Sequence, residues 1–292
     1  MNYQHAFHAG NFADVHKHAV LARILVHLRN KPAAFRVIDT HAGAGRYDLT
    51  SSEASRGGEW QNGIKRLWGG SPGPALKDFL SPYLKAVAAL NPVGSLRAYP
   101  GSPAIAQALL RRQDRLIACE LEPRAANALK RMLRGDLRAK ALSIDGWIAL
   151  GAYVPPKERR GLVLVDPPFE QTDDFSRLSN ELAATHRKWP TGIYLLWYPI
   201  KDRDAPDVLA RRLRKLGVPN VLRSELMHGS PRADGGLIGS GLILVNPPYQ
   251  LDAELRAHLP ELGRIFSSET ASRLDWLVRE RASERQRPLF HQ

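Results

Sequence analysis

The chain of 292 residues is long enough for one large or two modest domains, and its composition, 43% apolar and 24% charged, excludes disordered and fibrous proteins. Its 42 Lys and Arg against 29 Asp and Glu give a net charge of +13. That surplus favours a phosphate-bearing partner, although an Arg-rich chain also fits a GC-rich genome. No apolar run approaches the ~18–20 residues of a membrane span, and the polar, His-rich N-terminus is unlike a signal peptide, so a cytoplasmic protein is expected. The single cysteine, Cys119, excludes an internal disulfide and cysteine-cluster metal sites.

Short β-type apolar runs alternate with helical patterns, which predicts an α/β fold with a mostly parallel, Rossmann-like sheet. Seven strands are expected: Phe35–Thr40, Leu116–Glu120, Ala141–Ile144, Leu162–Asp166, Ile193–Tyr198, Val221–Met227 and Leu242–Asn246. Apolar residues at three- and four-residue spacing predict helices over Val15–Leu28, Pro103–Arg112 and Pro123–Arg134. In the first helix, Lys17 is expected to lie off the apolar face. Only about 14 residues, containing SPRADGG, join strands six and seven, so strand seven is expected to be antiparallel.

Residues 47–98 interrupt this alternation. They are rich in Gly, Pro and Ser without an obvious strand, and we interpret them as an inserted helical subdomain. From Arg279 onward, Arg and Glu alternate without apolar periodicity. We therefore expect one domain over residues 1–278, interrupted at 47–98, and a charged, flexible tail over 279–292.

The first strand runs into a small-residue loop, Asp39-Thr40-His41-Ala42-Gly43-Ala44-Gly45. Glycines there allow a ligand to approach the backbone, although such a loop can also be only a tight turn. A nucleotide site needs an acidic residue at the end of the next strand, about 20 residues later. Glu120 ends that strand but lies 75 residues past Gly45.

The insertion explains this mismatch. Ser102 lies 18 residues before Glu120 and immediately precedes Pro103, so it is expected to cap the helix that would otherwise follow the glycines directly. Ser102 would then lie beside His41 and Gly43 at the ligand. A purely structural cap is the alternative.

Two further strand ends carry chemistry. Asp145-Gly146 follows the third strand, where the carboxylate can accept from an adenine amino group, although Asp-Gly is also an ordinary turn. Asp166-Pro167-Pro168-Phe169 ends the fourth strand. There the Asp166 carboxylate and the Pro167 carbonyl can both accept from an NH₂ group on a ring, and Phe169 offers a face for a planar base. This tetrapeptide favours amino methylation, because its carboxylate also stabilises positive charge that develops on nitrogen.

A second tetrapeptide, Asn246-Pro247-Pro248-Tyr249, matches the same pattern. Ligands bind at the carboxyl ends of the parallel strands. Because this copy ends the antiparallel strand seven, it should face away from the ligand, and we interpret it as a structural turn.

Six of the ten histidines lie between His5 and His41, and no cluster of acidic or cysteine residues accompanies them, so no metal site is expected. They fit better as hydrogen-bond donors in a polar cover over the ligand. Nine basic against four acidic residues between Arg111 and Lys140, and seven against three between Lys201 and Arg223, could contact phosphates or form solvated helix faces.

Together these motifs resemble one family over residues 1–276: the bacterial large-subunit rRNA adenine-N6 methyltransferases of the RlmJ type. The motifs that carry the resemblance are Phe7-His8-Ala9-Gly10-Asn11, Asp14-Val15, Lys17-His18, Asp39 to Tyr47, Tyr99-Pro100-Gly101-Ser102-Pro103, Glu120, Asp145-Gly146, Asp166-Pro167-Pro168 and Leu196-Trp197-Tyr198-Pro199.

The resemblance implies a Rossmann-like class I S-adenosylmethionine-dependent methyltransferase with a helical insertion, which acts as a monomer on 23S rRNA and leaves S-adenosylhomocysteine. By motif position, the residues implied to contact the donor are His18, His41, Ser102, Glu120, Asp145, Gly146 and Asp166. Asp166 is implied as the catalytic acceptor, with Tyr3, Pro167 and Phe169 at the substrate. Phe169 stands where tyrosine is usual, so stacking is kept and a hydroxyl is lost. A guanine-N2 rRNA or adenine-N6 DNA methyltransferase, a dehydrogenase and a non-catalytic RNA-binding module remain as alternatives.

Overall fold

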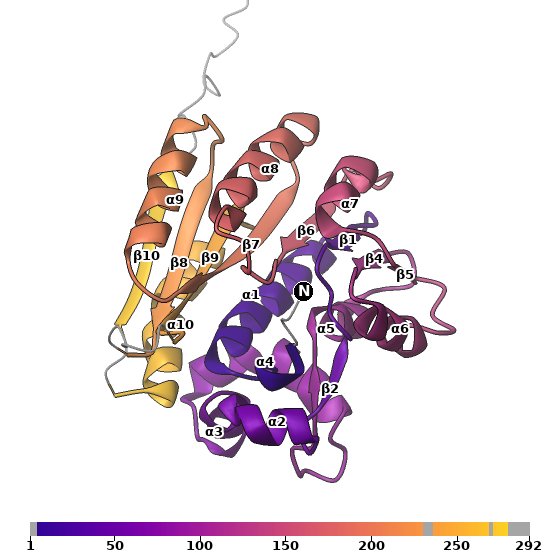
Figure 1. Cartoon of the computed structure of the whole chain (residues 1–292), viewed down its shortest axis with the longest axis vertical. Coiled ribbons are helices and arrows are strands. Elements are labelled where there is room, and N and C mark those ends of the chain that lie inside the picture. Colours follow the sequence, from indigo (N-terminus) through magenta and orange to yellow (C-terminus); the bar gives the residue numbers. More distant parts are fainter. Residues whose placement is uncertain (1–4, 230–235, 269–270, 280–292) are drawn as a thin grey trace, which may run out of the picture.

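A computed structural model describes residues 5–229, 236–268 and 271–279. Its centre is an eight-stranded sheet in the order β10-β8-β9-β7-β6-β1-β4-β5 (Figure 1). The strands are β1 (Arg36–Asp39), β4 (Arg115–Cys119), β5 (Ala139–Leu142), β6 (Gly161–Val165), β7 (Ile193–Ile200), β8 (Val221–Met227), β9 (Gly239–Val245) and β10 (Ala271–Val278). β1, β4, β5, β6 and β7 pair in parallel, whereas β9 is antiparallel to both β7 and β8. The expected antiparallel strand seven is therefore confirmed.

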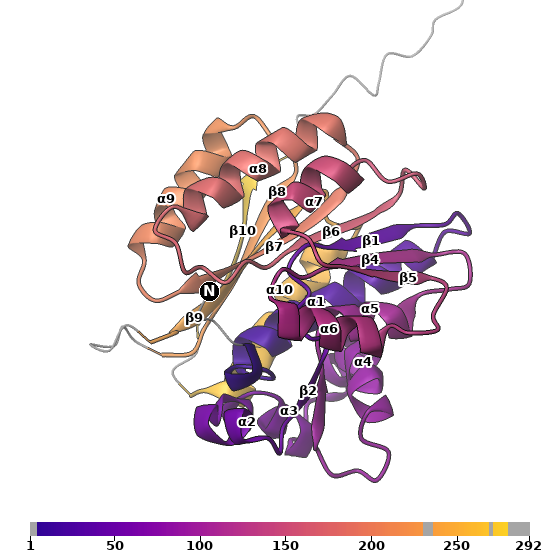
Figure 2. The same ribbon diagram turned by 45° about the vertical axis from the view of Figure 1, so that its right-hand side comes forward.

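Helices cover both faces of the sheet because its central strands are apolar on both sides. Figure 2 shows one layer on each side. One layer contains α7 (Gly146–Tyr153), α8 (Asp174–Lys188) and α9 (Asp204–Lys215). The other contains α1 (Phe12–Arg29), α5 (Ser102–Leu109), α6 (Pro123–Met132) and α10 (Leu251–Phe266). Along β6, Leu162 and Leu164 pack in the core beneath α1, and Val163 and Val165 pack in the core beneath α8.

The sheet has one strand more than the sequence predicted. Among the described residues, β10 is an edge strand that pairs with β8 alone, and its first three residues are exposed. Its polar residues interrupt the apolar run by which the other strands were predicted, so the sequence did not predict β10. Instead, Asp275 accepts two hydrogen bonds from the buried Arg223 of β8, at 2.9 and 3.0 Å, which aligns the two strands.

The segment between β2 (Arg46–Asp48) and β3 (Ala98–Pro100) forms no strand of the large sheet. These two short strands pair with each other, so the chain leaves and re-enters the fold at adjacent points. Between them lie α2 (Ser52–Gly57), the 3-10 helix η2 (Glu59–Asn62), α3 (Ile64–Gly69) and α4 (Pro74–Ala89), at the lower end of the molecule in Figure 1. The sequence did not predict β2 and β3, because three residues are too few for a periodic pattern.

Two local predictions need correction. Gly101, not Ser102, precedes the first residue of α5, and it makes no side-chain cap hydrogen bond; its backbone amide donates instead to the Gly45 carbonyl at 2.9 Å. Lys17 is not on a solvent-facing side of α1: its side chain is only 4% exposed, because α1 is buried nearly all round. Within the described ranges, no helix is long and apolar enough to span a bilayer.

Candidate active site

The carboxyl ends of β1, β4, β5 and β6 lie side by side in the sheet, and they bring to one edge the predicted site residues that follow them, His41, Glu120, Asp145 and Asp166. The loop after β1 is anchored on both sides. Thr40 donates its backbone amide to the Leu164 carbonyl of β6 at 3.0 Å, and Ala42 donates to the Cys119 carbonyl of β4 at 2.8 Å. This loop therefore crosses between the two neighbouring strand ends, where a doubly wound fold binds its ligand.

Glu120 contacts the loop after β1 at Gly43. The Gly43 amide donates to Glu120 Oε2 at 2.8 Å, and the Glu122 amide donates to Oε1 at 2.8 Å. Gly43 has φ +60°, and a Cβ there would lie 2.1 Å from the Tyr47 hydroxyl. A side chain at this position is excluded by both conformation and space, so the loop leaves backbone available to a ligand.

Asp145 begins α7, where Oδ1 accepts the amides of Trp147 at 2.7 Å and Ile148 at 3.4 Å. Gly146 packs so closely on the loop after β1 that a Cβ would lie 2.1 Å from the Thr40 carbonyl oxygen. The His41 ring meets the Trp147 ring edge-on, with 5.1 Å between centroids. These contacts bring Asp145 and Gly146 close to His41. Asp145 also caps α7, which is the role expected of an Asp-Gly turn that binds no ligand.

Asp39 is a buried carboxylate that the sequence analysis did not single out. Its side chain is 1% exposed, and within the described chain neither oxygen makes a hydrogen bond of ordinary geometry. Burial raises the pKa of Asp39 to about 7; the nearby Ser102 hydroxyl opposes this rise, and the charge of Asp166 adds to it. Ser102, which does not cap α5, therefore faces the end of β1.

Asp166 is bound by Lys17, which the sequence predicted to lie off the apolar face of its helix. Lys17 Nζ forms a short ion pair with Asp166 Oδ2 and a second one with Asp14 Oδ1 at 2.9 Å. Burial alone would lower the pKa of Lys17, but the charges of Asp14 and Asp166 outweigh it and raise that pKa. Asp14 in turn accepts from the Gly10 amide at 2.9 Å and from His5 Nε2 at 3.0 Å. Lys17 therefore fixes the orientation of the Asp166 carboxylate from the first turns of α1.

Aromatic rings surround this carboxylate. Phe169 adopts φ 51°, an uncommon conformation for a bulky residue, which points to a constrained loop. Its ring lies 4.9 Å from Phe175 and 5.7 Å from Trp197, the latter edge-on. Lys17 Nζ lies 5.7 Å from the Trp197 ring, so the aromatic pair and the ion pair form one cluster. The sequence shows Trp197 only as part of the Leu196-Trp197-Tyr198-Pro199 motif, and its position in the carboxyl half of β7 is the signal that places it at this edge.

His16 and His18 of α1 are buried rather than part of a polar cover. His18 is 1% exposed, and its Nδ1 lies 2.8 Å from the Tyr99 hydroxyl. His16 lies on the other side of the helix between Ser224 and Ser240, at 3.0 Å from each hydroxyl. His16 therefore joins α1 to β8 and β9, whereas His18 faces Tyr99 of β3.

His16 gives the stability of the protein a pH dependence. Burial lowers the pKa of His16 to about 3, whereas the unfolded chain titrates near 6.5. Below pH 6.5 the unfolded state binds a proton that the folded state excludes, so stability is complete above that pH and falls towards pH 3. We expect His16 to account for a loss of roughly 2 kcal/mol between pH 7 and 5. Urea unfolding of wild type and His16→Gln at both pH values isolates this loss, because all other groups are common; parallel pH curves would contradict it.

The rival tetrapeptide lies at the opposite edge of the sheet. Asn246 follows β9, where Val245 pairs with Tyr194 near the start of β7. Its Nδ2 donates to the carbonyls of Pro190 and Gly192, both at 2.8 Å. These hydrogen bonds and a φ of 52° support the interpretation of a structural turn.

The two basic runs are only partly available to an external anion. Arg111 and Arg138 are tied to Asp114 and Asp136, and Arg223 is buried. The exposed remainder is Arg112, Arg124, Lys130, Arg131, Arg134, Lys140, Lys201, Arg211, Arg212, Arg214 and Lys215. Tyr3 lies outside the described residues, as do residues 280–292 of the predicted tail.

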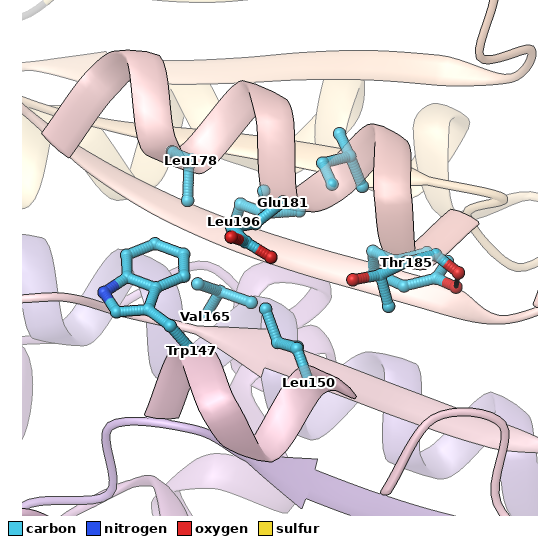
Figure 3. Close-up of a pocket in the computed structure, with 9 residues that line it drawn as sticks. Trp147, Leu150, Val165, Leu178, Glu181, Thr185 and Leu196 are labelled. Carbon is cyan, nitrogen blue, oxygen red and sulfur yellow. Dashed lines mark hydrogen bonds between the residues drawn. The ribbon is translucent and has the colours of Figure 1, made fainter. Parts of the chain in front are cut away.

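A small hollow lies between α7 and α8 (Figure 3). Trp147, Leu150, Leu178 and Leu196 line it with apolar side chains, and Glu181 also lines it. None of the predicted site residues that the structure describes lines it. The hollow therefore belongs to the packing of the α7–α8 layer on β6 and β7.

The sheet order, the glycine loop after β1 and the Asp-Pro-Pro-Phe turn after β6 define the class of Rossmann-like methyltransferases. The family model described as "Ribosomal RNA large subunit methyltransferase D, RlmJ" matches residues 32–278, and the chain belongs to this family. It is 39% identical to ribosomal RNA large subunit methyltransferase J of Escherichia coli (strain K12) and 37% identical to that of Haemophilus influenzae, covering 96% of this chain and all of each relative. The crystal structure of protein LPL1258 from Legionella pneumophila superposes with a TM-score of 0.83 at 32% identity, over 92% of this chain and 98% of that one.

Proposed function

We propose that the protein transfers the methyl group of S-adenosylmethionine to the N6 amino group of one adenine in 23S rRNA. We further propose that it acts as a monomer, in the cytoplasm, on free or partly assembled rRNA. The observation that carries this proposal is the Asp166-Pro167-Pro168-Phe169 turn beside the glycine loop, with its carboxylate oriented by Lys17, in a member of this family. Asp166 is the catalytic acceptor in this proposal.

The residues at this edge fit the donor, which carries a sulfonium and an ammonium cation. Asp14, Asp39 and Asp166 place three carboxylates near one lysine, Lys17, and Asp39 is buried and accepts no hydrogen bond of ordinary geometry within the described chain. Such an excess of negative charge in a poorly solvated site favours a cation. The cradle made by Gly43 and Gly146 suits an extended ligand lying across the strand ends.

We assign each part of the donor to residues on these loops. Glu120 would accept from the ribose hydroxyls, since each oxygen retains a lone pair after binding one amide. Asp145 would accept from the adenine amino group beside Gly146. His18, His41 and Ser102 would line the methionine end. Two exposed apolar side chains, Leu121 at 53% and Ile148 at 62%, follow Glu120 and Asp145, and an adenine ring would cover both.

The target base would be flipped out of its stack against Phe169 and Trp197. Its amino group would donate to the Asp166 carboxylate and the Pro167 carbonyl, which fixes the nitrogen for an in-line attack. The donor would supply an electrophilic methyl group: the carbon–nitrogen bond would form as the carbon–sulfur bond breaks, S-adenosylhomocysteine would leave, and the nitrogen would lose one of its two protons to solvent. As positive charge develops on the nitrogen, Asp166 stabilises it without reorganisation, because Lys17 already holds the carboxylate in place. Tyr3 would contact the RNA nearby.

RNA binding should depend steeply on salt, whereas donor binding should not. Neutralising three phosphates of a single-stranded segment predicts a roughly 20-fold loss of RNA affinity between 50 and 200 mM salt. Fluorescence anisotropy with a labelled rRNA hairpin and calorimetry with the donor would measure the two dependences. Equal salt dependence of both affinities would contradict a phosphate footprint.

The activity itself is tested by mass spectrometry of 23S rRNA from a deletion strain, with and without the plasmid-borne gene. We expect one unmethylated adenine without the gene and N6-methyladenine at that position with it. A missing N2-methylguanine, or a change in DNA adenine alone, would assign the enzyme to those alternatives instead. RNA binding without any methyl transfer would indicate a non-catalytic module.

A further inference from the structure

The inserted subdomain holds the chain segment that precedes α1. Glu59, in η2 of the insertion, accepts hydrogen bonds from two residues of that segment: His8 Nδ1 at 2.8 Å through Oε1, and Asn11 Nδ2 at 2.8 Å through Oε2. Beside it, the Ile64 amide donates to the Gly10 carbonyl at 2.8 Å. One carboxylate thus bridges the two ends of the His8–Asn11 segment from an element about 50 residues away in the sequence.

A continuous series of hydrogen bonds and ion pairs connects this segment to the Asp166 carboxylate. Asn11 caps α1, because its Oδ1 accepts the Asp14 amide at 2.8 Å. The Gly10 amide in turn donates to Asp14 Oδ2, and Asp14 Oδ1 binds Lys17 at 2.9 Å. Lys17 forms the ion pair with Asp166. Every link from Glu59 to Asp166 is a direct hydrogen bond or ion pair.

We expect Glu59 to affect the positions of the groups around Asp166 rather than the free energy of unfolding of the whole protein. The side chains of His8 and Glu59 are each 40% exposed, and exposed pairs contribute little to the free energy of unfolding. By contrast, displacing a catalytic group by about 1 Å can reduce a rate about 100-fold. A carboxylate that binds both ends of a four-residue segment restricts how α1 enters the fold, and hence where Lys17 Nζ lies.

We propose that Glu59 is a positioning residue: by holding His8 and Asn11, it aligns the start of α1 so that Asp14 and Lys17 keep Asp166 in its reactive orientation. The inserted subdomain is in this way a structural part of the methylation site. The inference rests on the proposed function, since it concerns the same carboxylate.

The test compares Glu59→Ala and Glu59→Gln with Glu53→Ala, a control in the same insertion whose side chain hydrogen-bonds, within the described residues, to the side chain of Ser52 alone. Single-turnover methylation of an rRNA fragment, donor and RNA affinities, and the melting temperature are measured for each. We expect a rate loss of about tenfold for Glu59→Ala and about threefold for Glu59→Gln, which keeps one acceptor. Affinities should change less than threefold and the melting temperature by less than about 3 °C. Wild-type rates for both variants, or losses that follow a lowered melting temperature, would overturn the proposal.

A second variant separates positioning from mere packing. Asn11→Ser keeps an oxygen that can cap α1 but removes the amide that donates to Glu59. Because both changes break the same link, the rate loss of Glu59→Ala combined with Asn11→Ser should be no greater than about twice that of Glu59→Ala alone. A rate loss in the double variant equal to the product of the two single-variant losses would contradict the proposal. If wild-type protein itself methylates no rRNA adenine, the proposed function fails; if only the Glu59 expectation fails, the function stands.

Discussion

Replacing Asp166 by Asn should abolish methyl transfer, with a rate loss of about 1,000-fold or more, while the donor still binds. The amide keeps the size of the carboxylate but removes the charge that stabilises a positive nitrogen in the transition state, and losing one preorganised group of this kind typically costs 100- to 1,000-fold. Loss of the ion pair with Lys17 adds misalignment to the loss of charge. Since Asp39 and Glu120 remain, donor affinity should fall by no more than about tenfold.

Single-turnover assays with tritiated donor measure the rate, and calorimetry measures donor affinity. The matched control is Asn246→Gly in the second tetrapeptide. Glycine tolerates the φ of 52° at that position, so the variant loses only the hydrogen bonds to Pro190 and Gly192. It should lose stability but methylate at the wild-type rate at a temperature where it is folded. If Asp166→Asn retained turnover, or if folded Asn246→Gly lost it, the catalytic role would belong to the Asn246 tetrapeptide and not to the Asp166 tetrapeptide.

The sheet could be predicted because its central strands are short, apolar and buried on both faces. Each of the seven predicted strands overlaps a strand of the structure, and the antiparallel β9 followed from a short connection. β10 could not be found in the same way, since its register depends on the pairing of Asp275 with Arg223, a contact between residues 52 positions apart. An edge strand needs fewer apolar residues, and so it gives a weaker pattern.

The gathering of the site residues was predictable for the same topological reason: the carboxyl ends of parallel strands meet at one edge. That argument fixes where Glu120, Asp145 and Asp166 lie, but it does not reveal their partners. Lys17 appeared solvent-facing because a lysine in a helix usually is, and only the packed fold brings it to a carboxylate 149 residues away. The local signal was Asp14, three residues earlier, which already forms half of the ion-pair network.

Lys17→Met should reduce both catalysis and stability. Methionine replaces the apolar length of the lysine but leaves Asp14, 2% exposed, and Asp166, 14% exposed, without their shared cation. Removing one partner of a buried ion pair typically costs 3–5 kcal/mol, and we expect a loss of about that size at pH 7. The methylation rate should fall about 100-fold even at a temperature where the variant is folded, because Asp166 is no longer oriented.

The pH dependence of the stability loss identifies its cause. In the wild type, burial would raise the pKa of Asp14, but the charge of Lys17, helped by His5 and His18, outweighs it and holds that pKa well below its usual value. The contribution of Asp14 is therefore complete above pH 4 and is lost only as the pH falls further. Lys17→Met removes the largest charge that opposes burial and leaves the smaller effects of His5 and His18, so the pKa of Asp14 should rise above its unfolded value. That variant then takes up a proton on folding and becomes less stable as pH rises. The difference in unfolding free energy between wild type and variant should thus widen from pH 5 to pH 7. The histidines common to both proteins do not affect this difference.

Urea unfolding at the two pH values measures this difference. The matched control is Lys65→Met, which replaces an exposed lysine over Trp60 and should show no change of the difference with pH. A difference that stays constant with pH in Lys17→Met would mean that Lys17 contributes packing rather than charge.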